Sequence, residues 1–387
     1  MHADAPDDGL AALTVSEGIH RFGSIRFDEF IDVALYGPDG FYSSGGGAGR
    51  AGGDFVTSPE VGPLFGAVVA RWLDAVWERV GRPDEFVVVE AAAGRGALAL
   101  AVLAAEPRCA PALRYVMVER SAALRARQAE HLALAQPFEV LGPTVDDDEV
   151  GGAAAPPVAG PLVVSLPDLP VQSVVGAVIA NELLDNVAFR LLERAADHWD
   201  DVRVAADVDG GLVELFVPAD TAVAALADEL VPEPPPGGRI PIQAAASDWL
   251  RRAVDLVERG SVLVIDYAVD ATAELAERPV GEWVRTYASH GSGGGPLDAV
   301  GRQDVTVEVA LDQLTAVAAP SVTDTQSDWL RRWGIDELVD EGRRIWDERA
   351  GAGDLAAIRA RSRIVEADAL CDPTGLGAFR VVEWHRP

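Results

Sequence analysis

The clearest hydrophobic pattern in the chain is a set of short, almost continuous apolar runs. They span residues 86–90, 114–119, 161–166, 174–180 and 261–266. Runs of this length, bounded by turn residues, are typical of strands that are buried on both faces of a parallel sheet. Stretches with helical periodicity at 97–105 and 121–135 alternate with them. The alternation predicts an α/β fold with a doubly wound, mostly parallel sheet.

The pattern changes outside these runs and in one stretch between them. Residues 25–42 and 64–80 have the apolar spacing of helices, and the glycine-rich segment 43–53 is a predicted loop. Residues 202–217 alternate about an Asp-Gly-Gly turn, which predicts a hairpin. A predicted helix at 247–260 leads into the last parallel strand.

The sequence therefore predicts three consecutive parts. A helical extension with a loop occupies residues 1–85, and the α/β core occupies 86–270 with the hairpin region inserted at about 190–245. A C-terminal elaboration over 271–387 has a glycine-rich loop, two helical patterns and a final strand at 378–384.

Charge restricts the partners that we expect. The formal net charge is −30, and all 32 basic residues are arginine. Such a chain repels phosphates, so nucleic acid is not an expected partner. An acidic surface suits a basic partner, such as an arginine-bearing protein, but it also fits a surface whose charge serves only solubility. The oligomeric state cannot be predicted from these features.

Composition also bears on location. No apolar run approaches the roughly 18 residues of a membrane-spanning helix, so no membrane segment is predicted. The N-terminus has no basic stretch followed by an apolar one, so we predict no signal peptide. The two cysteines, Cys109 and Cys371, are too few for a disulfide framework or a zinc site. We expect a cytoplasmic protein without a metal.

The first candidate site is the stretch VVVEAAAGRGALAL at residues 87–100, where a strand, a glycine loop and a helix follow one another. Such a loop binds nucleotide-type cofactors because the backbone approaches closely and the helix offers free N–H groups. Gly94, Gly96 and Ala99 fit the dinucleotide pattern, and Glu119 lies where its ribose-binding acid is expected. The loop alone therefore permits a dinucleotide, S-adenosylmethionine or a structural turn.

Glu90 favours S-adenosylmethionine over a dinucleotide at this loop. It ends the strand just before the loop, where its charge would face a pyrophosphate of the same sign. The same carboxylate favours a cationic group, such as the ammonium of S-adenosylmethionine. Glu119 suits either cofactor, because a carboxylate accepts both ribose hydroxyls.

A second candidate site is the segment NELLDN at residues 181–186, which follows an apolar strand. Ligands of open α/β sheets bind at such strand ends. On a helical turn Glu182 and Asp185 would share a face, and two carboxylates can hold a guanidinium or collect a proton. In the alternative, Asn181 caps a helix and the acids only favour its N-terminal dipole.

Several motifs in this order resemble the MidA family of class I S-adenosylmethionine-dependent methyltransferases, to which a mitochondrial complex I assembly methyltransferase is related. The resemblance covers nearly the whole chain. It is carried by LYGPDGFY (35–42), GGDFVTSPEVGPLFG (52–66), IANELLDN (179–186), WVRTYASH (283–290), GRQDVTVEV (301–309) and the C-terminal GLGAFRVVEW. The family implies a Rossmann-like methyltransferase core with extra elements. Its mitochondrial member implies methylation of protein arginine.

The resemblance also implies roles for individual residues. The methyl-donor contacts that it implies are Glu90, Gly94, Gly96 and Glu119, together with a covering loop that contains Gly53, Asp54, Phe55, Thr57 and Ser58. The candidates on the acceptor side are Asn181, Glu182 and Asp185, with Tyr267 and His290 as further ones. From the residues alone, a helix cap is the favoured interpretation of Thr57 or Ser58, and a lone histidine such as His290 is more often structural.

Four alanines depart from the family pattern. Ala92 and Ala268 replace glycines, whereas Ala93 and Ala188 stand where the family has proline. If the backbone at Ala92 requires a positive φ, alanine costs roughly 1 kcal/mol there. The alanines motivate one alternative function, an assembly protein that keeps the fold with weakened chemistry. A second alternative, in which the added elements form a substrate pocket, is a methyltransferase for nitrogen or oxygen atoms of small molecules.

Overall fold

The computed structural model of the protein describes residues 9–46, 57–142, 159–288, 291–351 and 354–387. They form two compact units, each assembled from three separate stretches of chain. The core unit takes its described residues from 56–182, 252–265 and 320–387. The accessory unit takes its described residues from 1–55, 183–251 and 266–319.

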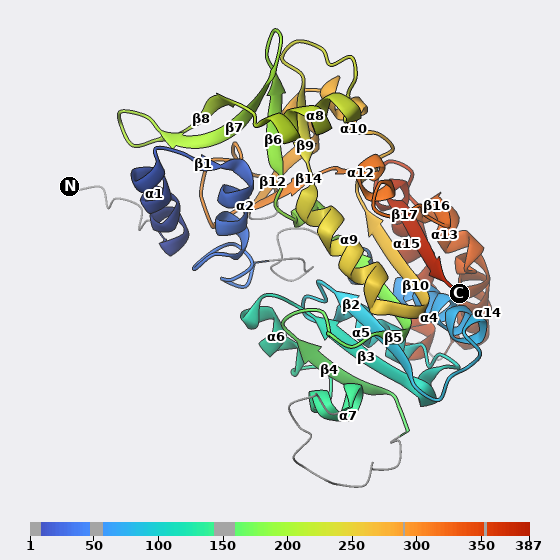
Figure 1. Cartoon of the computed structure of the whole chain (residues 1–387). Coiled ribbons are helices and arrows are strands. Elements are labelled where there is room, and N and C mark those ends of the chain that lie inside the picture. The colour runs from blue at the N-terminus through green and yellow to red at the C-terminus, as the bar shows by residue number, and fades with distance from the viewer. Residues whose placement is uncertain (1–8, 47–56, 143–158, 289–290, 352–353) are drawn as a thin grey trace. The chain divides into compact units, whose positions relative to one another are not determined.

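A seven-stranded sheet forms the centre of the core unit, in the order β16-β17-β10-β5-β2-β3-β4 (Figure 1). The pairs β10–β5, β5–β2, β2–β3 and β3–β4 are parallel, whereas β16 and β17 are antiparallel. All five predicted core strands are confirmed. The strands are β2 (Phe86–Ala91), β3 (Leu113–Val118), β4 (Leu162–Leu166), β5 (Val174–Asn181), β10 (Val257–Asp266), β16 (Val322–Thr325) and β17 (Arg380–Arg386).

Apolar burial and one close backbone approach fix this sheet. Strand β3 is buried along its whole length, as its continuous apolar run predicts. A Cβ added at Gly176 of β5 would lie 1.8 Å from the carbonyl oxygen of Val87, so β5 and β2 pack as they do only with glycine there. The indole nitrogens of Trp72 and Trp329 donate to the buried Glu383 of β17 at 3.1 and 2.8 Å, which ties this strand to two helices.

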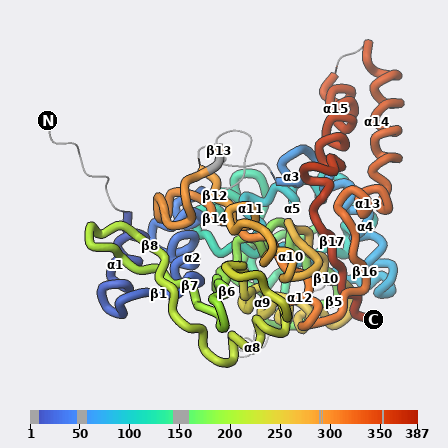
Figure 2. The backbone as a smooth tube through the Cα atoms, turned by 90° about the horizontal axis from the view of Figure 1, so that it is seen from above, coloured from blue at the N-terminus to red at the C-terminus, as the bar shows by residue number. Residues whose placement is uncertain are grey.

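The core unit also contains helices. Two of them, α14 and α15, run side by side as a helical hairpin (Figure 2). Those of the core unit are α3 (Ser58–Val61), α4 (Pro63–Arg79), α5 (Ala97–Ala104), α6 (Ala122–Gln128), α7 (Pro137–Leu141), α13 (Gln326–Arg332), α14 (Ile335–Arg349) and α15 (Leu355–Leu370), with 3-10 turns at Ala110–Ala112 and Leu376–Ala378. Searched over the described residues, the chain contains no helix long and apolar enough to cross a membrane.

Two predicted helices are shorter than expected. Helix α6 ends at Gln128 instead of reaching residue 135, and the N–H of Ala135 bonds instead to Val163 of β4 at 2.7 Å. Helix α9 (Ala244–Leu256) stops four residues before the predicted end at 260. Residues 257–260 belong to β10 instead, where Val257 pairs with Val174. In both places pairing with the sheet overrides local helical periodicity.

An antiparallel sheet organises the accessory unit, in the order β1-β7-β6-β9 with β8 paired to β7. The predicted hairpin is confirmed as β7 and β8. Residues 25–42 are not one helix, because Ile25 and Arg26 pair with β7 before α2 begins. The elements are α1 (Leu10–Phe22), β1 (Ile25–Arg26), α2 (Phe27–Tyr36), β6 (Arg190–Arg194), β7 (Trp199–Ala206), β8 (Leu212–Pro218), α8 (Thr221–Leu230) and β9 (Arg239–Ile242).

The rest of the accessory unit is built from short elements. Strand β12 pairs antiparallel with β13 and β14, and β11 pairs parallel with β15. The first two residues of the predicted loop at 291–295 form β13. The elements are β11 (Ala268–Val269), α10 (Thr272–Ala276), α11 (Val280–Trp283), β12 (Val284–Ala288), β13 (Gly291–Ser292), β14 (Asp304–Val307), β15 (Val309–Ala310), α12 (Leu311–Thr315) and the 3-10 turn Leu184–Asn186.

Candidate functional site

The glycine loop of the core unit connects β2 to α5. Its backbone has positive φ at Ala92 (55°), Gly94 (53°) and Gly96 (82°). A Cβ added at Gly94 would meet no atom within 4 Å, whereas one at Gly96 would lie 3.0 Å from the side chains of Leu132 and Met117. The positive φ of Gly96 favours glycine, and a Cβ there would also crowd these two side chains, whereas Gly94 leaves open space beside the loop.

Glu119 follows β3 and anchors this loop. Its carboxylate accepts the N–H of Gly94 at 2.9 Å and the N–H of Ser121 at 2.7 Å. The side-chain amide of Gln128 donates to the carbonyl of Gly94 at 2.8 Å, so both peptide groups of this glycine are held. Burial raises the pKa of Glu119 above its ordinary value, and the two N–H groups oppose the rise.

Glu90 lies in the interior beside the loop. It is buried, and the hydroxyl of Tyr115 donates to its Oε2 at 2.8 Å. Burial raises the pKa of Glu90 to about 8, the bond from Tyr115 opposes the rise, and the nearby Glu119 adds to it. Near neutral pH this carboxyl therefore holds a proton in the absence of a neighbouring cation.

The predicted covering loop is described only from Thr57 onward; Gly53, Asp54 and Phe55 lie outside the described residues. Thr57 is the N-cap residue of α3, but its side chain makes no capping bond. The hydroxyl of the buried Ser58 donates to Gln326 at 2.9 Å, and its N–H donates to Oε1 of Glu182 at 3.1 Å. Ser58 thus links α3 to the end of β5.

Glu182 follows β5 in a strained conformation, with φ of 52°. The amide of Asn181 donates to its Oε1 at 2.9 Å, beside the bond from Ser58. Asn181 is the last residue of a strand, so it does not cap a helix. The expected helical face shared by Glu182 and Asp185 is also wrong, because only Leu184–Asn186 form a 3-10 turn and the positive φ of Glu182 precedes it.

Asp185 belongs to the accessory unit, where the 3-10 turn rests on Asp266. The N–H groups of Leu184 and Asp185 donate to Oδ2 of Asp266 at 2.8 and 3.4 Å, and that of Tyr267 donates to Oδ1 at 2.9 Å. Burial raises the pKa of Asp266 to about 7, although the backbone bonds oppose the rise. The turn that carries Asp185 is thus fixed at its backbone.

Three of the quoted motifs meet beside this turn. The hydroxyl of Tyr42 donates to Oδ1 of Asn186 at 2.9 Å, and the amide of Asn186 donates to Asp304 at 3.0 Å. Asn186 and Asp304 are buried, and the ring of Tyr36 stacks on Tyr42 with centroids 5.3 Å apart. These bonds orient the turn from its other side.

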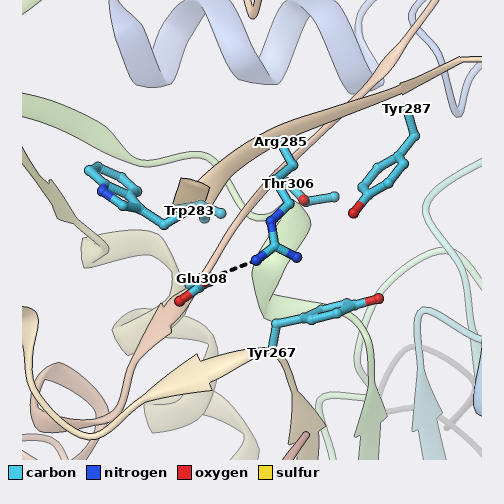
Figure 3. A pocket seen from close by; sticks show the side chains of 7 residues that line it. Tyr267, Trp283, Arg285, Tyr287, Thr306 and Glu308 are labelled. Atoms are coloured by element: carbon cyan, nitrogen blue, oxygen red, sulfur yellow. Dashed lines mark hydrogen bonds and ion pairs between the residues drawn. The ribbon is translucent and has the colours of Figure 1, made fainter. Parts of the chain in front are cut away.

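Of the two remaining candidates, Tyr267 lines a small pocket of the accessory unit with Arg285 and Tyr287 (Figure 3). His290 lies outside the described residues. Within the described ranges, no group of three or more His, Cys, Asp or Glu side chains is arranged to hold a metal ion.

Comparison with known proteins identifies the family. The model of a family described as S-adenosyl-L-methionine-dependent methyltransferase matches residues 68–326. The chain belongs to this family. Its predicted fold, MidA-type family membership and methyl donor, S-adenosylmethionine, are thereby confirmed.

Individual relatives and one solved structure agree with this family assignment. Mitochondrial protein arginine methyltransferase NDUFAF7 of Danio rerio is 25% identical over 332 residues, covering 82% of this chain and 75% of that protein. Its Drosophila melanogaster homolog is 38% identical over 96 residues, covering only 24% of this chain and 22% of that protein. A crystal structure of a Burkholderia thailandensis protein bound to S-adenosyl-homocysteine matches with a TM-score of 0.76 and 25% identity, over 100% of this chain and 95% of that one.

The core unit of the methyltransferase fits the methyl donor. The open space beside Gly94 admits a ligand against the backbone. The lone pairs of Glu119 that are not used by Gly94 and Ser121 suit two ribose hydroxyls. The cost of ionising the buried Glu90 falls beside a cationic donor. These residues would hold the donor.

Sequence reasoning missed some residues that the site depends on. Tyr42, Asn186 and Asp304 stood inside quoted motifs, but their separation in the chain concealed the hydrogen-bonded chain that joins them. Gln128 looked like an ordinary residue of a helix, and only the fold brings its amide to Gly94. Gln128 is a polar residue that α6 buries completely, but only the structure shows this burial, so the sequence contained no signal for it.

The loop supplies a stability prediction at Ala92. Because its φ of 55° is in the left-handed region, Ala92→Gly is expected to raise the free energy of unfolding by about 1 kcal/mol. Chemical denaturation monitored by circular dichroism measures the change. Ala93→Gly is the matched control: its φ is not positive, so glycine should lower stability by roughly 0.5 to 1 kcal/mol. Equal effects of the two substitutions would argue against strain at Ala92.

Glu90 supplies a prediction about pH. Its folded pKa of about 8 lies above the ordinary 4.5, so the folded state keeps a proton that the unfolded state loses. The stability from this group is fully present below pH 4.5 and is lost as pH rises through 8, by up to about 1.4 kcal/mol per pH unit.

Glu90→Gln isolates this contribution, because glutamine resembles the protonated side chain. The raised pKa of Asp266, about 7, also makes stability fall as pH rises, but this contribution is the same in both proteins. Denaturant unfolding at pH 6, 7 and 8 should therefore show a smaller loss of stability with rising pH in Glu90→Gln than in the parent chain, without bound donor. Parallel pH profiles would show that Glu90 does not titrate in this range.

Proposed function

We propose that this methyltransferase methylates the guanidinium group of arginine in a protein substrate, and that Glu182 is the catalytic residue that receives the acceptor. The observation that carries the proposal is the fixed carboxylate of Glu182 at the end of β5, held by Asn181 and Ser58 on a strained backbone. Strain of this kind is concentrated at functional sites of proteins. The carboxyl ends of parallel strands are also where such sheets bind ligands.

The chemistry of arginine methylation matches this carboxylate. When bound, S-adenosylmethionine supplies a methyl group on a positively charged sulfur. Glu182 would accept hydrogen bonds from a guanidinium, turn one nitrogen toward the methyl group, and take up the proton that the nitrogen releases. Asp185, whose turn in the accessory unit is fixed by Asp266, stays a predicted acceptor-side residue.

Two further observations support a protein as the acceptor. The names of the vertebrate and insect relatives describe protein arginine methyltransferases. The net charge of −30 attracts a basic partner and steers it toward the surface at low salt.

Labelled methyl donor tests the proposal directly. The full chain is incubated with host lysate and S-adenosylmethionine carrying a labelled methyl group, and labelled proteins are hydrolysed to amino acids. Label in methylarginine, absent with Glu182→Gln, supports the proposal. Label only in small molecules would favour a small-molecule methyltransferase, and donor binding without any labelled product would favour an assembly protein.

A further inference from the structure

Helix α15 of the core unit is held by its neighbours on two sides. On the side toward α14, the guanidinium of Arg363 donates to the carbonyl of Leu338 and to the carboxylate of Glu341, each at 2.9 Å (Figure 2). On a second side, the buried Glu366 accepts the N–H of Leu64 at 2.9 Å, which ties α15 to the start of α4. A third side of the helix carries none of these contacts.

This third side of α15 is exposed and mainly apolar. Leu355, Ile358 and Val365 are 72, 53 and 69% exposed, and Ala369 is exposed as well. Together with Ser362 they follow the spacing of the a and d positions of a coiled coil, so they form one row along the helix. A helix face that meets only water is expected to be polar. The row therefore indicates a contact surface for another helix.

The charges beside this row favour a second copy of the chain as the partner. Arg361 and Asp368 are both exposed and flank the row on the same side, at equivalent positions of successive heptads. If two copies of α15 lie antiparallel about a two-fold axis, Arg361 of each copy meets Asp368 of the other. In the same register Ile358 lies opposite Ala369, so the two apolar rows also meet.

A parallel arrangement of the two helices lacks these ion pairs. In that orientation Arg361 would meet Glu366 of the other copy, at the usual spacing of such pairs. The Glu366 side chain is buried, and it already accepts the N–H of Leu64 and the hydroxyl of Ser362. It is thus withdrawn from an interface on the exposed side, which favours the antiparallel orientation.

We propose that the protein forms a homodimer through the exposed side of α15, with the two helices antiparallel and joined by two Arg361–Asp368 ion pairs. The helix has 16 residues and is about 24 Å long. The contact is therefore small beside the roughly 1,200–2,000 Å² that stable interfaces bury, and the dimer should dissociate at about 1–100 μM. The inference does not depend on the identity of the methyl acceptor.

Sedimentation equilibrium of the full chain from about 1 to 500 μM measures this association. The mass should rise with concentration from that of one chain, 40.8 kDa, toward twice that value. Val365→Glu places a charge in the middle of the apolar row, so it should raise the dissociation constant by at least about tenfold.

Charge reversal tests the orientation of the helices. Asp368→Arg and Arg361→Asp each bring like charges together in the antiparallel dimer, so each variant alone should associate about tenfold more weakly than the parent chain. An equal mixture of the two variants should regain the parent affinity, because opposite charges meet again at both contacts. Asp347→Arg, at an exposed site of α14, makes the same change in net charge as Asp368→Arg and should associate like the parent.

Three results would overturn the inference. They are a monomer throughout the concentration range, a dimer that Val365→Glu and the charge reversals leave unchanged, and weakened variants that do not recover when mixed. Circular dichroism of each variant verifies that its helices are retained, so that a loss of association is distinguished from a loss of folding.

Discussion

Replacing Glu182 with glutamine is expected to lower kcat by about 100-fold or more while leaving the affinity for S-adenosylmethionine nearly unchanged. Glutamine keeps the shape of the side chain, so its Oε1 still accepts the bonds from Asn181 and Ser58. What is lost is the charge that fixes a guanidinium and the capacity to take up its proton. Initial rates with labelled donor give kcat, and calorimetry gives the donor affinity.

A matched control for the loss of one carboxylate is Glu258→Gln. Glu258 is exposed and lies near the start of β10, at the opposite edge of the parallel strands from Glu182. This variant should keep the parent kcat. A fall in donor affinity as large as the fall in kcat for Glu182→Gln would contradict a role for Glu182 on the acceptor side.

Glu119→Gln is expected to weaken binding of S-adenosylmethionine by at least about tenfold. The two oxygens of Glu119 accept hydrogen bonds from the backbone N–H groups of Gly94 and Ser121. In glutamine an NH2 group replaces one oxygen, and because it cannot accept a hydrogen bond, one of these two bonds is lost. The charged acceptor for the ribose hydroxyls is lost as well. Calorimetric titration with the donor measures the change.

Glu130→Gln serves as the control for this substitution, because Glu130 is exposed just beyond α6. Its donor affinity should equal that of the parent chain. If Glu119→Gln bound the donor as tightly as the parent does, the assignment of Glu119 to the ribose would fail, whatever its effect on stability.

The parallel strands could be predicted because each is buried on both faces, so its sequence is an unbroken apolar run. The ends of α6 and α9 could not, because the residues that follow them are recruited by strands far away in the sequence. The helical periodicity at 257–260 does not show that Val257 pairs with Val174, which is far away in the sequence. Local pattern thus located the elements better than their boundaries.

The candidate site divides in the same way. The glycine loop follows β2 and Glu119 follows β3 of the same βαβ unit, so the sequence alone was enough to name them as candidates. The surroundings of Glu90 were not visible, because Tyr115 approaches it from the neighbouring strand. The left-handed backbone of Glu182 was also hidden, since positive φ at a glutamate follows from packing and not from the residue type.

Calorimetric titration of the full chain with S-adenosylmethionine tests the central claim most directly, namely that the loop between β2 and α5 holds a cationic methyl donor beside Glu90 and Glu119. We predict saturable binding of one donor per chain. At pH 7 binding should release protons, because a cation favours the ionised form of Glu90, whose pKa is raised to about 8, and Glu90→Gln should release fewer. Absence of saturable binding into the millimolar range would contradict the account.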